Sequence, residues 1–529
     1  MNRILRTAAP LLSAVLLCQC GAPQPPQCHR VPITSRAPAA SLLAEARQNW
    51  AILGNPSRKS EWAAARTSYN DATAKLFDQL RCGSDGWDSR AAAIGTRMAA
   101  PGARDTSLPA LDTVFPASKV NGHVVHNHRI TEGVGVPLVG WKKTSPVGQK
   151  RKKFLLPNGL PYNLTAVLAF DQSGAPVWHF EKRWKQEEIR IGNATHTLAA
   201  DWSAPNSFYW HMCDLDDLKI QNVILPDRYM EESGVYFVTP YDPEKIPVVF
   251  VHGLVSSPDA FKNIINELAP EPWFRERYQI WLYNYPTGNP WTLSAMNFRE
   301  KMREACDYAR SKGHDRNLNR MVVVAHSMGG LITRSSVTAP GKVMYDGIFT
   351  KPIDTFGVSS VTKELISKTL LYQPITEPKR VVFLAVPHKG SPMATYGPAV
   401  WISKLIRLPK TLTIDLLDTT VLAAGDVLKG QDPTDHLPTS INSLSPNNRS
   451  TRALAMLPLP KHITFHSVIG DRGKGNTPES SDGVVPYWSS HVTPVTSEKI
   501  VPSNHSVPDN DEAAEELKRI LKLHLTNKN

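Results

Sequence analysis

The stretch that most limits how this chain can fold is residues 321–334, where an apolar run meets a run of small residues. Residues 321–324 (Met-Val-Val-Val) have the composition of a fully buried strand, and residues 331–334 (Leu-Ile-Thr-Arg) are compatible with a helix. Between them lies Ala-His-Ser-Met-Gly-Gly, residues 325–330, whose small side chains let a strand and a helix approach closely at a sharp turn. A strand that leads directly into a helix predicts a parallel sheet.

Further apolar runs alternate with helical stretches through the second half of the chain, as expected for an α/β fold. Several of these runs end in Gly, Pro or Asn, which indicates where the strands stop. The pattern predicts strands at residues 248–251, 280–283, 381–386 and 463–469, a charged helix at about 295–311, and a terminal amphipathic helix at about 510–525.

Two stretches, at about 331–380 and 393–462, are too long for simple crossovers between parallel strands. Connections of this length are usually functional, and these two would lie over the ends of the strands. We therefore expect a catalytic domain at residues 241–529 with two helical cap insertions.

The first half of the chain has a different organisation, as expected because 529 residues exceed the length of one ordinary core. Residues 41–117 begin Ala-, Glu- and Arg-rich and then become small and polar, which predicts a helical segment followed by a linker. Residues 118–240 contain short β-like runs separated by turn signals, which predicts a mainly β accessory domain.

Residues 1–22 have the pattern of a signal peptide, with Arg3 and Arg6 before a short apolar run. Cys18 and Cys20 close this segment, and two interpretations of them stay open. One of them is lipidated, or both are lost when the signal peptide is cleaved. A bacterial lipidation motif has a small residue directly before the cysteine, whereas Leu17 and Gln19 stand there.

Export predicts a periplasmic, outer-envelope-attached or secreted protein, with a peripheral or lipid-anchored membrane association as its corollary. Cys28, Cys82, Cys213 and Cys306 would then lie in an oxidising compartment, where we expect one or two disulfides at most.

The net charge of +12 is partly explained by a basic run at residues 142–153, which we interpret as a solvated loop. The alternative is attraction to an anionic envelope component. The run has no interleaved aromatic residues, so we expect no nucleic-acid partner. The histidine group His123, His126 and His128 has no Cys, Asp or Glu within its stretch. We therefore expect neither a metal nor another cofactor.

Ser327 is the predicted nucleophile because it stands at the centre of the sharp strand-to-helix turn. An acyl-transfer site also needs donors for the oxyanion. The backbone N–H of Met328, directly after the serine, is one candidate. The other is the backbone N–H of Leu254, which follows the predicted strand 248–251 and Gly253.

The acid and the base are expected to follow the serine in the order Asp or Glu and then His. Asp482 precedes an apolar run on an Asp-Gly turn, and we favour it over Asp471, which has basic neighbours. His505 stands in a loop just before the last helix and is the predicted base. We place it ahead of His491, which is closer to the acid, and of His524, which we expect on the surface of the helix.

At these residues the sequence resembles the α/β-hydrolase superfamily, in its lipase/esterase branch. The resemblance runs from about residue 247 to the C-terminus and includes a Pro-His-Lys-Gly-Ser stretch at residues 387–391, similar to one in triacylglycerol lipases. It implies an α/β-hydrolase core with helical cap insertions, a Ser327-Asp482-His505 triad, and an acyl-ester substrate such as a lipid. The alternatives left open are an acyltransferase or amidase acting on an envelope component, and a non-catalytic surface-binding protein.

Overall fold

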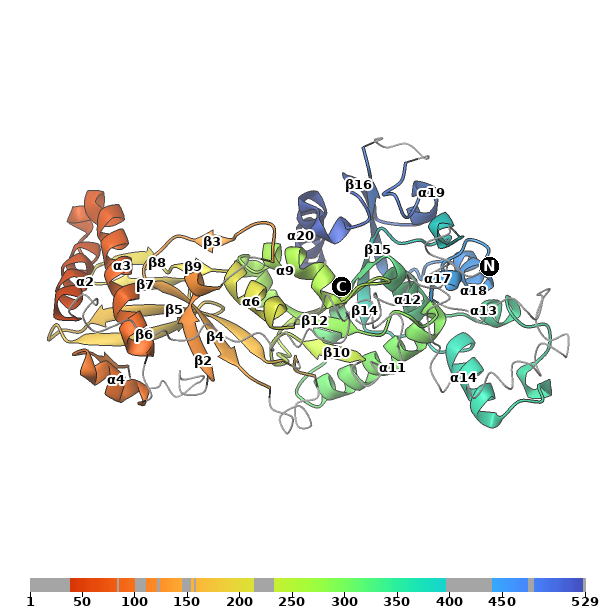
Figure 1. Cartoon of the computed structure of the whole chain (residues 1–529). Coiled ribbons are helices and arrows are strands. Elements are labelled where there is room, and N and C mark those ends of the chain that lie inside the picture. The colour runs from red at the N-terminus through yellow and green to blue at the C-terminus, as the bar shows by residue number, and fades with distance from the viewer. Residues whose placement is uncertain are drawn as a thin grey trace, which may run out of the picture.

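The computed structural model describes nine stretches of the chain, and they form two sheets with helices packed against both (Figure 1). The N-terminal helices and a five-stranded sheet occupy one end of the molecule, and a seven-stranded sheet built from the second half of the chain occupies the other. The described residues are 39–82, 85–99, 111–120, 124–144, 154–156, 158–213, 233–395, 440–473 and 480–526.

The five-stranded sheet has the order β1-β6-β5-β4-β2, with β1 parallel to β6 and the other neighbours antiparallel. Two small ladders accompany it: β3 (Ile130–Thr131) pairs with β9 (Ala200–Asp201), and β7 (Glu188–Ile191) pairs with β8 (Ala194–Thr197). The five strands are β1 (Arg97–Met98), β2 (Thr113–Pro116), β4 (Val136–Lys142), β5 (Leu160–Phe170) and β6 (Pro176–Lys182).

The N-terminal helices cover one face of this sheet. They are α2 (Ala39–Leu53), α3 (Trp62–Arg81) and α4 (Trp87–Ala93). Phe77 of α3 packs edge-on against Trp178 of β6 at 6.1 Å between ring centroids, inside a core that both elements share. The boundary expected at residue 117 therefore does not separate two structures. Strands β1 and β2 lie within the expected linker and belong to the sheet, because their apolar residues complete its buried surface.

The seven-stranded sheet has the order β10-β12-β11-β13-β14-β15-β16. All neighbours are parallel except the edge strand β10, which is antiparallel to β12. The strands are β10 (Gly234–Phe237), β11 (Ile246–Val251), β12 (Tyr278–Asn284), β13 (Met321–His326), β14 (Pro378–Leu384), β15 (Thr464–Asp471) and β16 (Ser497–Pro502).

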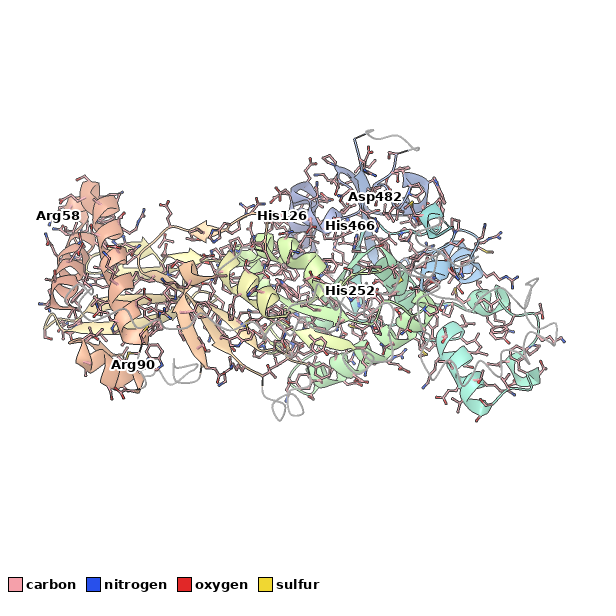
Figure 2. The ribbon with its side chains drawn as sticks, viewed as in Figure 1. Arg58, Arg90, His126, His252, His466 and Asp482 are labelled. Atoms are coloured by element: carbon pink, nitrogen blue, oxygen red, sulfur yellow. The ribbon has the colours of Figure 1, made fainter. Side chains whose placement is uncertain are left out.

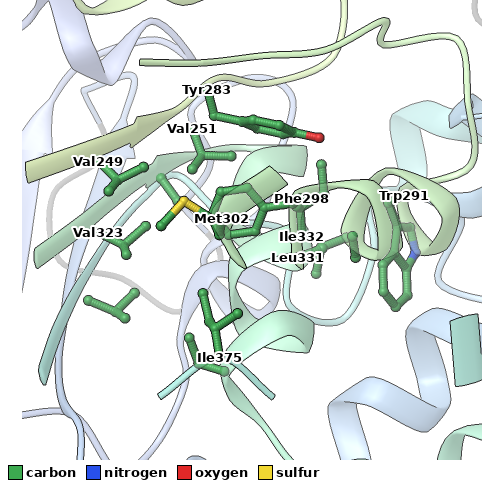
Figure 3. Packing of buried hydrophobic residues seen from close by; sticks show 14 of the residues in the cluster. Val249, Val251, Tyr283, Trp291, Phe298, Met302, Val323, Leu331, Ile332 and Ile375 are labelled. Atoms are coloured by element: carbon green, nitrogen blue, oxygen red, sulfur yellow. The ribbon is translucent and has the colours of Figure 1, made fainter. Parts of the chain in front are cut away.

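Helices pack on both faces of this sheet, and its central strands β11 and β13 are accordingly fully buried and mostly apolar. On one face, α11 (Trp291–Arg310) and α12 (Met328–Val337) bury Phe298, Met302 and Leu331 against Val249 and Val323 (Figure 3). The other face is covered by helices that include α9 (Lys262–Leu268) and α20 (Asp511–Thr526). The remaining α-helices among the described residues of this half are α10 (Pro272–Arg277), α13 (Val343–Asp346), α14 (Ser360–Leu370), α17 (Ser440–Ser443), α18 (Arg449–Met456) and α19 (Tyr487–Ser490).

The two halves share a hydrophobic core. Helix α6 (Ser203–Cys213) lies between them, and its Phe208 packs against Phe115 and Trp141 of the five-stranded sheet at 5.0 and 5.2 Å between ring centroids. The same cluster continues into Phe250 and Leu282 of the seven-stranded sheet. The accessory sheet is therefore packed against the second half rather than tethered to it.

Three expectations differ from the structure. Residues 235–238, expected in the accessory domain, lie mostly in β10 of the larger sheet, where Phe237 stacks on Trp281 at 4.3 Å. The insertion expected from residue 331 begins later, because α12 runs to Val337 within the core. Strand β16 was not expected, since its sequence is polar and only one of its residues is fully buried. Most of the second insertion, residues 396–439, lies outside the described residues.

Other expectations concern the chemistry of the chain outside the sheets. The signal segment with Cys18 and Cys20, Cys28, and most of the basic run lie outside the described residues. Cys82 forms a disulfide, whereas Cys213 and Cys306 are free thiols. Within the part of the chain that the structure describes, no helix combines the length and the apolar character needed to cross a membrane.

Candidate active site

Ser327 lies at the turn between β13 and α12, in a backbone conformation that residues with side chains rarely adopt. Its φ and ψ are 53° and −126°, and its N–H donates to the carbonyl of Leu384 at 3.0 Å. The two glycines that follow make this turn possible. A Cβ on Gly329 would lie 2.4 Å from the carbonyl oxygens of Val251 and His252, and one on Gly330 would lie 2.0 Å from the Val386 side chain.

His505 and Asp482 form one hydrogen-bonded chain with this serine. His505 Nε2 lies 2.8 Å from Ser327 Oγ, and His505 Nδ1 lies 2.7 Å from Asp482 Oδ2. The other carboxylate oxygen of Asp482 accepts the N–H groups of Val484 and Val485 at 2.8 and 2.7 Å. The Asp482 side chain is 1% exposed and that of His505 22%, so the carboxylate is buried while the imidazole is partly open to solvent.

Each of the three side chains comes from a different connection at the sheet. Ser327 follows β13, Asp482 lies in the connection between β15 and β16, and His505 lies between β16 and α20. Since β13, β15 and β16 are parallel members of one sheet, their carboxyl ends meet at one edge, and this edge assembles the chain of hydrogen bonds. Figure 2 shows Asp482 in the half of the molecule that also holds His252, well away from Arg58 and Arg90.

The competing acid and bases are engaged elsewhere. Asp471, whose basic neighbours made it the less favoured acid, is the buried last residue of β15, and its carbonyl accepts the N–H of Ser503. His491 pairs with Glu498 at 2.7 Å. His524 is buried rather than exposed, because its ring fits between the guanidinium of Arg380 and the carbonyl of Arg320.

The segment expected to supply an oxyanion donor lies directly against the serine. A Cβ on Gly253 would lie 2.9 Å from Ser327 Cβ, so the backbone that leads into Leu254 passes beside the nucleophile. Met328 opens α12 immediately after the serine. Both expected donors thus belong to backbone segments that adjoin Ser327.

Two side chains that the sequence did not single out hold this loop from either end. Tyr285 Oη donates to the carbonyl of His252 at 2.8 Å, and its ring stacks on the His252 ring at 4.4 Å. Thr287 Oγ1 accepts the N–H of Val255 at 3.3 Å, where the backbone again has a positive φ, 51°. The one signal near them in the sequence was the predicted strand at residues 280–283, which ends just before both side chains.

The Pro-His-Lys-Gly-Ser stretch at residues 387–391 supports the loop that carries the acid. Ser391 Oγ donates to the carbonyl of Val484, and the N–H of His388 donates to the carbonyl of Ser489 at 3.0 Å. Burial, with Arg334 close by, lowers the pKa of His388 well below its usual value and keeps the ring neutral. The stretch therefore helps to position the loop that carries Asp482. Its own side chains are not members of the hydrogen-bonded chain of Ser327, His505 and Asp482.

Two of the three histidines considered for a metal site are described, and each makes a contact of a different kind. His128 Nε2 lies 2.9 Å from Asp201 Oδ2, whereas the backbone N–H of His126 donates to Asn263, and His123 is outside the described residues. Among the described residues there is no cluster of His, Cys, Asp and Glu that could hold a metal ion.

A family model described as "Putative serine esterase (DUF676)" matches residues 242–473. This segment contains Ser327 and the loop around Leu254 and begins just before strand β11. The second half of this chain is an esterase-type hydrolase. A comparison with curated proteins found no significant match.

Several solved structures are similar to part of this chain. The lipase BlEst2 of Bacillus licheniformis in its propeptide form has 16% identity and a TM-score of 0.35, over 56% of this chain and 54% of that one. The metagenomic carboxyl esterase MGS0156 has 17% identity and a TM-score of 0.27, over 50% and 65%. The phospholipase PlaB of Legionella pneumophila has 14% and 0.27, over 47% and 46%. The chain thus spans about half the length of the first of these, and likenesses this remote carry no information about its substrate.

Proposed function

We propose that this protein is an exported esterase that cleaves carboxylic esters through an acyl-enzyme on Ser327. The observation that carries the proposal is the continuous chain of hydrogen bonds from Ser327 Oγ through His505 to Asp482, at 2.8 and 2.7 Å. A serine whose proton can pass to a neighbouring imidazole is an activated nucleophile, and a buried carboxylate on the far nitrogen stabilises the imidazolium that forms.

In this mechanism His505 Nε2 takes the hydroxyl proton as Ser327 Oγ attacks the acyl carbonyl carbon. The negative charge on the carbonyl oxygen is stabilised by the backbone N–H groups of Met328 and Leu254. The tetrahedral intermediate collapses when His505 gives the proton to the leaving alkoxide, which releases the alcohol. Water then attacks the acyl-enzyme with His505 again as base, and the carboxylic acid leaves.

The decisive experiment is a hydrolysis panel of p-nitrophenyl esters from short to long acyl chains, with the Ser327→Ala variant as control. We expect turnover by the native protein and loss of nearly all of it in the variant. Retention of native turnover by the variant would place the chemistry elsewhere. A native, folded protein with no turnover on any ester of the panel would refute the proposal. Mass spectrometry of the protein trapped with a fluorophosphonate should locate the adduct on Ser327.

Export and envelope attachment are part of the same proposal. They are supported by the basic and apolar residues of the signal segment and by the disulfide at Cys82, since disulfides persist mainly in oxidising compartments. Cell fractionation with metabolic palmitate labelling tests both points. We expect a processed protein outside the cytoplasm, and label that disappears in Cys18→Ser or Cys20→Ser identifies the lipidated residue.

The insertions are proposed to act as a cap that shapes access to Ser327. Helices α13 and α14 belong to the first insertion and α17 and α18 to the second, and α13 packs on α18, so the two insertions meet. An acyl chain would enter beside them. We therefore expect changes in this region to alter preference for acyl-chain length on the same ester panel, while a short acetyl ester is hydrolysed at the native rate.

A further inference from the structure

His326, the residue before the nucleophile, makes a contact that the mechanism above does not use. Its Nε2 lies 2.8 Å from the main-chain carbonyl oxygen of His505, and the two imidazole rings are 4.9 Å apart. A carbonyl oxygen can only accept a hydrogen bond, so Nε2 of His326 carries the proton. The side chain next to the nucleophile therefore holds the backbone of the base.

This bond is the main anchor of the His505 peptide group. His505 lies in an irregular loop between β16 and α20. Within the described residues, the His326 ring is the one group that hydrogen-bonds to the His505 main chain. Since the imidazole must stay within hydrogen-bond reach of both Ser327 and Asp482, the position of this peptide decides whether both contacts can form at once.

The His326 ring also touches the loop that leads to the proposed oxyanion donor. A Cβ on Gly253 would lie 3.2 Å from His326 Nδ1, so the ring packs against the glycine backbone. One buried side chain, at the end of β13, thus contacts both the loop that carries His505 and the loop that leads to Leu254.

The environment of His326 requires the ring to stay neutral. Within the described part of the chain no group hydrogen-bonds to Nδ1, and this atom is buried. Burial first, and then the neighbouring His505, lowers the pKa of His326 to about 3. A proton on Nδ1 would create an unpaired buried charge beside the imidazolium that forms during catalysis. The groups that face the ring are His505, Asp482 and His252.

We infer that His326 is a positioning residue of the proposed esterase: as a neutral Nε2–H donor to the His505 carbonyl, it fixes the base over Ser327. The inference rests on the proposed function of Ser327, His505 and Asp482. The hydrogen bond of His326 goes to the His505 main chain and not to its imidazole, so its effect passes through the position of that imidazole.

Two amide substitutions separate this role from simple packing. The amide nitrogen of glutamine stands as many bonds from Cα as Nε2 of histidine, whereas that of asparagine corresponds to Nδ1. His326→Gln can therefore restore the donor, and His326→Asn cannot. We expect kcat to fall about tenfold to a hundredfold in His326→Asn with KM little changed, and His326→Gln to recover most of the loss. His326→Met, which keeps the volume without a donor, should resemble asparagine.

His314→Gln is the matched control, because His314 is an exposed histidine that pairs with Glu244 on the surface. It should retain native kcat. A kcat for His326→Asn within about twofold of that for His326→Gln would overturn the inference, as would a His326→Met enzyme with native kcat. If these variants match the native enzyme while Ser327→Ala is inactive, the positioning role fails and the esterase mechanism stands.

A second readout does not depend on activity. Nitrogen-15 NMR of histidine-labelled protein, with His326→Gln to assign the signal, reports the tautomer of the ring directly. We expect His326 to be the Nε2–H tautomer and not to titrate between pH 5 and 8. An Nδ1–H tautomer, or titration within that range, would overturn the inference even if no ester substrate had been found.

Discussion

At the scale of single residues, the proposed acid Asp482 is held more tightly than the proposed base His505. Asp482 has both oxygens in use, one on His505 and the other on two backbone N–H groups, and its side chain is almost fully buried. His505 retains exposure, as a base must if it is to reach substrate and water. From this difference we predict that the Asp482 carboxylate acts by orienting the His505 imidazole and by stabilising its positive charge.

Asp482→Asn keeps the shape of the side chain and removes its charge. The amide can still accept from Val484 and Val485, but it cannot stabilise an imidazolium, and it can hold the wrong histidine tautomer. We expect kcat to fall by about three to four orders of magnitude, the scale seen in serine proteases. Steady-state ester hydrolysis measures this. Glu498→Gln is the control, since Glu498 binds His491 and Tyr487 instead, and a comparable loss there would remove the distinction.

At the scale of elements, the sheet edge that carries Ser327, Asp482 and His505 contains turns in which glycines leave no room for a Cβ. The contact between α12 and Val386, just after β14, depends on Gly330 having no Cβ. The loop proposed to supply an oxyanion donor is held from both ends by Tyr285 and Thr287, through His252 and Val255. Both devices fix the backbone rather than the catalytic side chains, and each can be tested separately.

Gly330→Ala should destabilise the fold by about 1–3 kcal/mol, because the added methyl overlaps the Val386 side chain. Val386→Ala in the same protein should return part of that loss. Chemical denaturation gives the free energies of unfolding. Gly86→Ala serves as comparison, since nothing lies within 4 Å of its added Cβ, and a similar cost at both glycines would contradict the packing argument.

Tyr285→Phe removes one hydroxyl and keeps the ring stacked on His252. The carbonyl of His252 then lacks its donor, so we expect a loss of stability of about 1–3 kcal/mol and also a reduced kcat. Tyr69→Phe is a matched control. Its hydroxyl donates to the buried carbonyl of Leu168 in the N-terminal sheet, so stability should fall there with native kcat. Equal effects of the two variants on kcat would show that the loop is not held through Tyr285.

At the scale of the whole molecule, a buried group of polar residues lies on strands β14 and β15 and helix α20. Arg380 donates to Nε2 of His466 and to Nδ1 of His524, so both rings accept from a guanidinium and must be neutral. Burial first, and then nearby cationic arginine, lowers the pKa of His466 to about 3, and burial lowers that of His524 to about 4. Figure 2 labels His466 in the same half of the molecule as Asp482.

These histidines predict that the protein loses stability in acid. Between about pH 6.5 and 4 the unfolded chain binds protons at both residues while the folded chain does not, so the free energy of unfolding falls as pH falls. Each histidine contributes up to about 1.4 kcal/mol per pH unit. His466→Gln, whose amide oxygen can still accept from Arg380, should give a shallower slope in urea denaturation at pH 7, 6 and 5. An unchanged slope would exclude His466 as a source.

The sequence by itself determined the sharp turn at Ser327, the buried parallel strands and the terminal helix, because each depends on local composition and spacing. It also favoured Asp482 and His505 by their order along the chain. Only the tertiary structure decided what depends on contacts between distant segments. Strand β10 joins the larger sheet through Phe237, β1 and β2 join the smaller one, and His524 is buried beside Arg380. The hydrogen bond from His326 to the His505 main chain was also decided by the tertiary structure. The two residues are 179 positions apart, and no local pattern encodes the bond between them.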